Sequence, residues 1–397
     1  MLASEFKSPS TRSNSPPATG STMYFFPDVT LRTRSGVQWL ATFCAKESCV
    51  KVMKFLVSCN AAMSGADMSQ GVPKTRAEVK DLQRLRQLFL DAPGRQGLED
   101  YWQDESLLSL YDATYARRIG WKWQAVLAEL ENRDWTIPRN IRRWLDWGCG
   151  SGIASETLIE FVGATLPEEM VFSDRSKKAM HFASQKLASM TSGCRLTTSP
   201  PENALATQND LLLISHVLTE LTQSEMDALV NKISHAGVIV WVEPGTPFCS
   251  QRLIEVRARL KDKFSIVAPC PQQKSCPLET REGDWCHFFA PPPPIIFQDS
   301  FWTTFAKEMN IDLRSLPVSF LVLENNAIAE PMTSKESHRK RLIARPRFLK
   351  GHAKAMFCNS NGEATVEDLP QKRFKHEFKK WERDCFFVQL TNDQDSD

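Results

Sequence analysis

Apolar residues in the N-terminal half of the chain recur at helical spacing. Between Lys74 and Asp91 they stand three or four positions apart with charged residues between them, which predicts an amphipathic helix. One or two further helices are expected between Leu98 and Asn132, with a break near Asp104 or Asp112. We interpret this helical section as a module that packs against the domain that follows it.

From Arg142 the pattern changes to short apolar runs that alternate with helical segments. The run at 210–215 is apolar almost throughout, which is typical of a parallel strand buried on both faces. The alternation predicts an α/β fold with an open, doubly wound, Rossmann-like sheet. Strands are expected at 144–146, 170–174, 210–215 and 238–242, and helices at 155–162, 177–190 and 224–234.

Composition divides the remainder of the chain. Past Phe264 the alternation stops and the sequence becomes rich in Cys and Pro, and the C-terminal part is conspicuously basic. We expect a leader at 1–60, a helical module at 61–140 and a Rossmann-like domain at 141–265. A Cys-rich segment at 266–300, a basic region at 301–390 and a polar tail at 391–397 complete the chain.

Total charge and apolar content exclude little. Lys and Arg number 49 against 47 Asp and Glu, so net charge alone indicates no particular partner. No apolar run approaches the roughly 18 residues of a membrane span, so we expect no association with a membrane. The 11 cysteines are an odd number on a long chain, which favours a reducing compartment over a disulfide framework.

The leader permits two interpretations. Residues 1–23 are rich in Ser, Thr and Pro, and Arg32 and Arg34 follow. Such a segment is typical of an organelle transit peptide, although Glu5 and Asp28 disturb the pattern. A disordered tail is an equally good interpretation of the same composition.

A glycine loop follows the first predicted strand. Its glycines at 148, 150 and 152 let the backbone approach a ligand closely, but Ile153 stands where a dinucleotide motif needs another glycine. A Lys-Ser/Thr pair for a phosphate loop is also missing, so the loop favours a ligand without a pyrophosphate. Asp174 ends the second strand, where a carboxylate binds ribose hydroxyls.

These features resemble the class I methyltransferases, whose cofactor is S-adenosylmethionine. The resemblance implies that the cofactor contacts Asp146, Gly148, Gly150, Gly152 and Asp174.

Catalytic residues are not indicated by the sequence. The N-P-P-Y motif of amine methylation is absent after the 210–215 strand, and neither Cys149 nor Cys249 has the Pro-Cys context of pyrimidine C5 methylation. His216 follows that strand and is either a general base or, as we favour, a side chain that hydrogen-bonds the backbone.

Three cysteines, Cys270, Cys276 and Cys286, lie within a Pro-rich segment of irregular structure. They favour metal ligation and free thiols equally, because their spacing matches no standard zinc finger or ferredoxin motif. A metal site needs a fourth ligand from His287, Cys358 or Cys385.

Several segments together resemble the methyltransferase-like proteins of the mitochondrial small ribosomal subunit and their bacterial relatives. The most specific are SHVLTEL, VEPGTP, CPQQKSCPL, DWCHF and RPRFLKGHAKAMFCNSNG, and the similarity runs from about Tyr111 to Trp381. The resemblance implies a 4Fe-4S cluster held by Cys270, Cys276, Cys286 and Cys358, whereas thiolate chemistry alone also allows zinc. It also implies the mitochondrial matrix, with the cytoplasm as the alternative because the leader is a poor transit peptide.

The chain departs from the family pattern in two places. Gln272 follows the Cys-Pro pair where relatives often have His, and the expected W-G-D near the C-terminus reads W-E-R-D at 381–384.

A basic run without acids follows in the C-terminal region, and aromatic residues are interleaved in its continuation to 381. Basic side chains contact phosphates and aromatic rings stack on unpaired bases, so we interpret the region 301–390 as RNA-binding, against a plain solvated surface. The residues predicted to contact RNA are Arg339, Lys340, Arg341, Arg345, Arg347, Lys350 and Lys354.

The leading hypothesis for the function is therefore an assembly factor or component of the mitochondrial small ribosomal subunit. It would bind the subunit's rRNA beside ribosomal proteins and would be a monomer outside the ribosome. The alternative is an active methyltransferase that modifies this rRNA, which the intact glycine loop leaves open. The basic run disfavours a third hypothesis, a methyltransferase of small molecules or proteins.

Overall fold

The computed structural model describes residues 75–91, 100–102, 104–329, 339–377 and 389–391. The chain divides into two units, Met1–Ala45 and Lys46–Asp397, and every described residue belongs to the second. The leader predicted at 1–60 lies outside the described residues. None of the described helices is long and apolar enough to cross a membrane.

The N-terminal part is helical, as predicted. Asp104 is the N-cap of a helix and accepts a hydrogen bond from the Leu107 N–H (2.8 Å); the described residues before it, 100–102, are not helical, so a helix begins where a break was predicted. A break at Asp112 is wrong, because the chain continues through a π-helical turn into the next helix. The elements are α2 (Arg76–Asp91), α3 (Glu105–Tyr111), the π-helix (Asp112–Ala116) and α4 (Arg117–Asn132).

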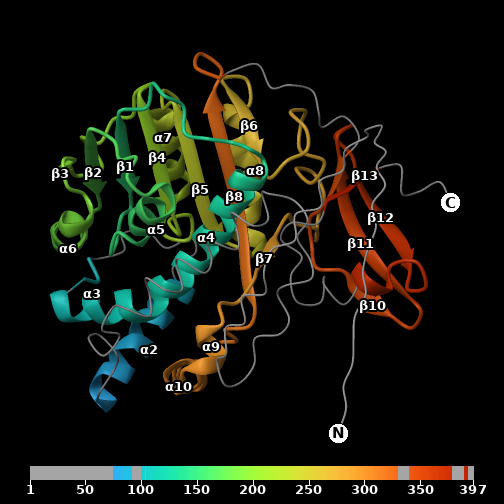
Figure 1. Cartoon of the computed structure of the whole chain (residues 1–397), viewed down its shortest axis with the longest axis horizontal. Helices are drawn as coiled ribbons and strands as arrows, with labels where there is room; N and C mark the ends of the chain where they lie inside the picture. Colours follow the sequence, from blue (N-terminus) through green and yellow to red (C-terminus); the bar gives the residue numbers. More distant parts are fainter. Residues whose placement is uncertain (1–74, 92–99, 103, 330–338, 378–388, 392–397) are drawn as a thin grey trace, which may run out of the picture. The chain divides into compact units, whose positions relative to one another are not determined.

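A mixed sheet forms the centre of the fold (Figure 1). Its strand order is β3-β2-β1-β4-β5-β8-β6, with β7 paired to β8; β1 to β5 are parallel, and β8 runs antiparallel to its neighbours. The strands are β1 (Arg143–Trp147), β2 (Glu169–Ser173), β3 (Arg195–Thr198), β4 (Asp210–Ser215), β5 (Val238–Pro244), β6 (Phe264–Ala268), β7 (Phe288–Ala290) and β8 (Leu316–Asn325).

Helices cover both faces of this sheet (Figure 1). In β4, Leu211 and Leu213 pack in the apolar cluster that contains α4, α5 and α6, whereas Leu212 and Ile214 pack with α7 and α8. The doubly wound sheet of a class I methyltransferase fold is thus confirmed, with the antiparallel β8 inserted between β5 and β6. The helices are α5 (Ile153–Val162), α6 (Lys177–Leu187), α7 (Gln223–Ile233) and α8 (Pro247–Leu260).

The C-terminal part forms a separate antiparallel sheet. Two short helices, α9 (Ile295–Gln298) and α10 (Ser300–Glu308), precede β8 in the chain, and the second sheet follows it. Its strand β11 pairs with β9, β10 and β12, and β13 pairs with β9. These strands are β9 (Arg339–Leu342), β10 (Arg347–Leu349), β11 (His352–Asn359), β12 (Ala364–Pro370) and β13 (Gln389–Thr391).

A buried ion network joins the two sheets. The carboxylate of Glu129 on α4 accepts hydrogen bonds from both terminal nitrogens of Arg341 on β9, the Nη2 bond being 2.7 Å long. Arg133 binds the same carboxylate (2.9 Å) and also donates to the main-chain oxygens of Val267 and Pro269 at the end of β6. Because Glu129 and Arg341 are each about 1% exposed, neither charge is solvated without the other.

We expect Glu129→Gln to destabilise the protein by about 3–5 kcal/mol, because it removes the buried negative charge that both guanidinium groups bind. Urea denaturation followed by circular dichroism measures the effect. The control is Glu168→Gln, which removes an exposed partner of Arg142 and should cost less than about 1 kcal/mol. Equal losses in the two variants would contradict the structural role of the network.

Candidate cofactor and metal sites

The glycine loop after β1 has the backbone that its sequence predicts. Gly148, Gly150 and Gly152 have φ values of 71°, 50° and 75°, in the left-handed region that favours glycine. A Cβ atom at Gly148 would lie 2.6 Å from Val217 Cγ1, whereas one at Gly150 would meet nothing within 4 Å. The loop is therefore closely packed at its first glycine and open at its second.

Asp174 accepts a hydrogen bond from this loop, and Asp146 accepts one from the helix that follows it. The Asp174 carboxylate accepts hydrogen bonds from the Gly150 N–H (3.0 Å) and the Ser176 N–H (2.9 Å). Asp146 is buried beneath the loop, where its Oδ2 accepts from Ser155 Oγ (2.7 Å) and burial raises its pKa to about 6. Each Asp174 oxygen retains further lone-pair capacity for a ligand hydroxyl.

A cavity of about 900 Å³ lies against the loop. Gly148, Gly150 and Asp174 line it, whereas Asp146 and Gly152 do not. Its volume is within the usual range for small-molecule sites. Three of the five residues predicted to contact a cofactor are thus brought together, and Asp146 and Gly152 support them from below.

Residues from the N-terminal part of the chain also line the cavity. Tyr101, Tyr111 and Arg118 are among them, so the helical module both packs on the sheet and shapes the cavity. Tyr101 Oη donates to Glu220 (3.0 Å), and burial raises the pKa of that carboxyl to about 7. These aromatic and acidic residues were not singled out from the sequence, because Tyr101 and Glu220 stand in irregular segments that come together only in the folded chain.

Glu243 at the end of β5 fixes the chain that follows β4. Its Oε1 accepts from the N–H groups of Val217 (3.0 Å) and Leu218 (3.1 Å), and from Trp241 Nε1 (2.8 Å). Val217 is the residue against which Gly148 packs. Glu243 therefore sets the distance between the β4 end and the glycine loop, and only its place in the VEPGTP segment hinted at a role.

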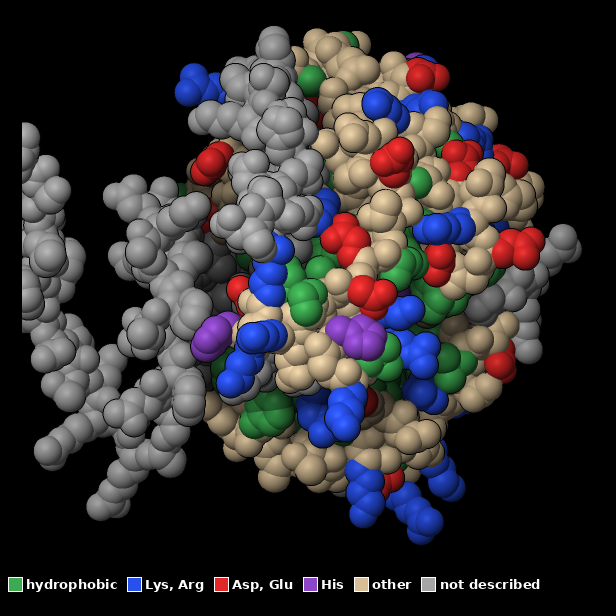
Figure 2. Space-filling model, turned by 90° about the vertical axis from the view of Figure 1, so that its right-hand side faces the viewer, with side chains coloured by type: hydrophobic (Ala, Val, Ile, Leu, Met, Phe, Trp, Pro, Cys, Tyr) green, Lys and Arg blue, Asp and Glu red, His purple; other side chains and the backbone are tan. Residues whose placement is uncertain are grey.

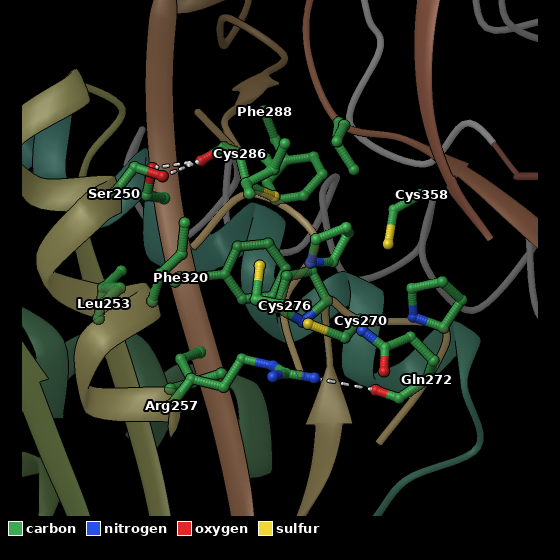
Figure 3. A pocket seen from close by; sticks show the side chains of 18 residues that line it. Ser250, Leu253, Arg257, Cys270, Gln272, Cys276, Cys286, Phe288, Phe320 and Cys358 are labelled. Carbon is green, nitrogen blue, oxygen red and sulfur yellow. Dashed lines mark hydrogen bonds between the residues drawn. The ribbon is translucent and has the colours of Figure 1, made fainter. Parts of the chain in front are cut away.

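The four predicted cysteine ligands line one small cavity of about 50 Å³ (Figure 3). Cys270 and Cys276 lie in the segment after β6, Cys286 precedes β7, and Cys358 comes from β11 of the C-terminal sheet. His287 does not line this cavity; its Nδ1 lies 3.1 Å from the Trp285 main-chain oxygen. Cys385, the other alternative, lies outside the described residues.

Hydrogen bonds hold the cysteine segments against α8, β8 and β9. The main-chain oxygen of Cys286 accepts from Ser250 Oγ (2.8 Å) and Ser319 Oγ (2.9 Å), and the next N–H, of His287, donates to Ile343 (2.9 Å). Lys274 Nζ donates to Asn361 in the turn after β11 (3.2 Å). The cavity is thus built by both sheets.

The thiols repel one another's charge. Burial first, and then the neighbouring cysteines, raise the pKa of Cys276 to about 11 and that of Cys358 to about 12, and the same causes raise the pKa of Cys286. Thiolates form there only with a cation to share their charge. As the side chains stand, no three His, Cys, Asp or Glu residues in the described part of the chain converge on a single metal ion.

Arg257 supplies a separate observation about the same cavity. This α8 residue is 2% exposed, and its Nη2 donates to the main-chain oxygens of Gln272 (3.4 Å) and Lys274 (2.5 Å) (Figure 3). Its Nε and Nη1 are buried and have no hydrogen-bond partner among the described residues. A buried guanidinium with idle donors fits a cavity that holds an anionic thiolate–metal group.

Of the seven basic residues that were predicted to contact RNA, some are buried and others are exposed. Lys340 is buried beside Glu367 (2.8 Å) and Arg341 belongs to the ion network, so both serve inside the protein. Arg345 is exposed and stacks on the Phe289 ring, 3.7 Å from its centroid. Arg347, Lys350 and Lys354 are also exposed, and the side chain of Arg339 is not among those described.

The exposed basic residues gather on the C-terminal sheet. Arg347 and Lys354 lie directly opposite each other on β10 and β11, so they share one face. Figure 2 shows Lys and Arg side chains grouped on the side of the molecule that carries this sheet. An extended anion can therefore contact several of them at once.

Residues 111–383 match the family model described as mitochondrial small ribosomal subunit Rsm22. The chain belongs to this family. The four cysteines, the glycine loop and the basic residues of the C-terminal sheet all lie inside the matched segment. The chain matches none of the curated proteins.

Solved structures give weaker likenesses to this Rsm22-family chain. A candidate RNA methyltransferase from Pyrococcus horikoshii is 9% identical, with a TM-score of 0.32 over 63% of this chain and 98% of its own. The plantazolicin methyltransferase BamL, solved with SAH, is 12% identical, with a TM-score of 0.32 over 63% and 97%. A SAM-dependent methyltransferase from Aquifex aeolicus is 12% identical, with a TM-score of 0.30 over 41% and 89%.

Glu243 should make stability depend on pH. Burial raises its pKa to about 7, well above the roughly 4.3 of an unfolded Glu, so the folded state holds the extra proton between these values. The free energy of unfolding therefore falls as pH rises from about 4 to 7. Glu243→Gln keeps the accepting oxygen and removes the titration.

The free energy of unfolding of Glu243→Gln should rise relative to that of wild type by about 1–3 kcal/mol between pH 5 and pH 8. Urea denaturation of both proteins at the two pH values measures this change. A pH-independent difference for Glu243→Gln would mean that this carboxyl does not titrate as its burial requires.

Proposed function

We propose that this protein is an assembly factor or component of the mitochondrial small ribosomal subunit that binds its rRNA in the mitochondrial matrix. It would hold S-adenosylmethionine in the large cavity and a 4Fe-4S cluster between the four cysteines. The observation that carries the proposal is the position of Cys358. This residue is on the basic sheet yet lines the same cavity as Cys270, Cys276 and Cys286.

The family supports the ribosomal partner, and the fold supports the cofactor. The glycine loop with Asp174 fits an adenosine ligand that carries no pyrophosphate. An iron-sulfur cluster, when bound, supplies positive iron to four thiolates, and Arg257 would donate hydrogen bonds toward the same anionic group. Loss of the cluster would then loosen the contact between the basic sheet and the methyltransferase fold.

RNA would lie along the exposed basic face. Arg347 on β10 and Lys354 on the neighbouring β11 would contact phosphates of the RNA. Arg345, held by Phe289, would present its guanidinium plane to an unpaired base. Ribosomal proteins of the subunit would be the remaining partners, and the free protein would be a monomer.

An active rRNA methyltransferase is the second candidate function. It is favoured by the intact glycine loop and by the open cavity beside it. Transfer of labelled methyl from the cofactor to purified small-subunit rRNA distinguishes this candidate from a purely binding role.

Cys358→Ser should lose iron, sulfide and the broad visible absorption of the anaerobically purified protein, because the cavity would keep only three thiols. Cys194→Ser, a half-buried cysteine that does not line this cavity, should retain all three. If the wild type contains zinc and no iron, the four cysteines remain the proposed ligands but the iron-sulfur cluster is refuted. If it contains no metal, both the ligand set and the cluster are refuted.

Gly148→Ala should raise the Kd for S-adenosylhomocysteine at least tenfold, because the new Cβ would displace Val217. Isothermal titration calorimetry measures this affinity. Gly163→Ala is the control: it also places Ala at a positive φ (63°), but its Cβ would meet nothing within 4 Å. Unchanged binding by Gly148→Ala would place the cofactor elsewhere.

The double variant Arg347→Gln/Lys354→Gln should bind small-subunit rRNA more weakly and reduce the slope of log K against log salt by about 1–2. Fluorescence anisotropy at several salt concentrations measures both. The control, Arg139→Gln/Lys177→Gln, removes two exposed charges elsewhere on the fold. Equal effects of the two pairs would contradict a defined RNA-binding face.

A further inference from the structure

Two groups stand out among the charged residues that line the large cavity, which also include Arg175, Glu225, Lys232 and Asp312. The acidic group comprises Asp100, Asp174 and Glu220, whose charges act on one another. The basic group comprises Arg86, Arg118, Lys122 and His216; in addition to burial, Arg86 lowers the pKa of Arg118, Arg118 that of Lys122, and Lys122 that of His216. The glycine loop lies beside the acidic group, whose Glu220 is paired with Arg175.

Lys122 and His216 are the centre of the basic group. Lys122 on α4 is 4% exposed, and its Nζ lies 3.2 Å from His216 Nε2. His216 follows β4 with a φ of 55°, and its Nδ1 lies 3.4 Å from Ser215 Oγ, which accepts from Trp123 Nε1 (2.9 Å). This chain of contacts fixes the pair on the cavity wall.

The basic group is only partly balanced by acids in the described part of the chain. Asp312 also lines the cavity and acts on Arg118, but its carboxylate pairs with Arg314 (2.9 Å). Among the described residues Arg86, Arg118 and Lys122 form no ion pair, and Arg118 Nε is buried without a hydrogen-bond partner. Arg118 Nη2 reaches only the Ser315 main-chain oxygen (3.3 Å). Several like charges beside one cavity, with a donor unused, are stabilised by an anion that enters it.

The basic group is also close to the cofactor loop. His216 and Val217 follow β4, which pairs with β1, and Gly148 of the loop packs directly against Val217. An anion held by Lys122 and Arg118 would thus lie in the same cavity as a cofactor bound at Asp174.

We infer that the basic group is a subsite for the phosphate of a nucleotide acceptor, bound beside the cofactor and separate from the RNA-binding face of the C-terminal sheet. The inference rests on the proposed function for the ligand at the acidic side. A phosphate is recognised by the forked donors of Arg118 and Arg86 and by the ammonium of Lys122.

Binding at this subsite would be linked to proton uptake. Burial, and then the charge of Arg118, lower the pKa of Lys122 to about 7, while Cys249 and Glu243 act weakly in the opposite direction. His216, the other neighbour, is itself held neutral by burial and by these two cations. A phosphate raises the pKa of Lys122, so affinity should fall as pH rises above about 7.

The test is calorimetric titration of the dinucleotide UpU, whose phosphodiester does not titrate near neutrality, into full-length protein saturated with S-adenosylhomocysteine. We expect at least tenfold weaker binding at pH 8.5 than at pH 6.5, with proton uptake revealed by buffers of different ionisation enthalpy. Lys122→Met and Arg118→Gln should each weaken UpU binding at least tenfold at pH 6.5, with the affinity for S-adenosylhomocysteine changed less than twofold.

Two controls separate charge from folding. Lys122→Arg should bind UpU with little dependence on pH, because its guanidinium does not titrate there. Arg139→Gln, an exposed residue outside the cavity, should behave as wild type.

The outcomes are distinct. Variants that weaken S-adenosylhomocysteine instead of UpU would assign the basic group to the cofactor's own carboxylate and overturn the inference. Absent or pH-independent UpU binding by wild type would also overturn it. UpU binding that depends on Lys122 without any binding of S-adenosylhomocysteine would support the subsite and refute the proposed cofactor.

Discussion

The Glu129 carboxylate, enclosed with the guanidinium groups of Arg341 and Arg133, determines how the two sheets of the protein meet. Arg341 belongs to the C-terminal sheet, and Arg133 donates a hydrogen bond to the main-chain oxygen of Pro269, just before Cys270. A charge shut away from water must be matched in place, so small displacements of either sheet are costly. The position of Cys358 relative to Cys270 is consequently set by electrostatics as well as by apolar packing.

Helix α4 links this network to the large cavity. Lys122 and Glu129 are both on it, and at 1.5 Å per residue they lie about 10 Å apart along the axis. One rigid helix thus carries a residue of the basic cavity wall and the centre of the network beside the cysteines. A displacement of α4 at Glu129 would therefore also move Lys122.

The sequence was informative where function depends on a local pattern. The glycine loop, Asp174 and the alternation of strands predicted the sheet correctly, because buried parallel strands and tight turns have short-range signatures. Burial of Lys340 and Arg341 was not foreseeable, since a basic run resembles a solvated surface until its partners are known. Their partners, Glu367 and Glu129, lie in distant elements, and nothing local in a helix marks Glu129 as buried.

The late position of Cys358 in the chain bears on the order in which the protein is completed. Domains made from the N-terminus fold first, so the methyltransferase sheet and three of the thiols exist before β11 has been synthesised. Until then the cavity lacks its fourth thiol. A chain that stopped before β11 would hold the methyltransferase sheet and Arg341 on β9, but it could not complete the set of cysteines. The cysteine cavity is therefore a feature that the chain can acquire only after its first sheet has formed.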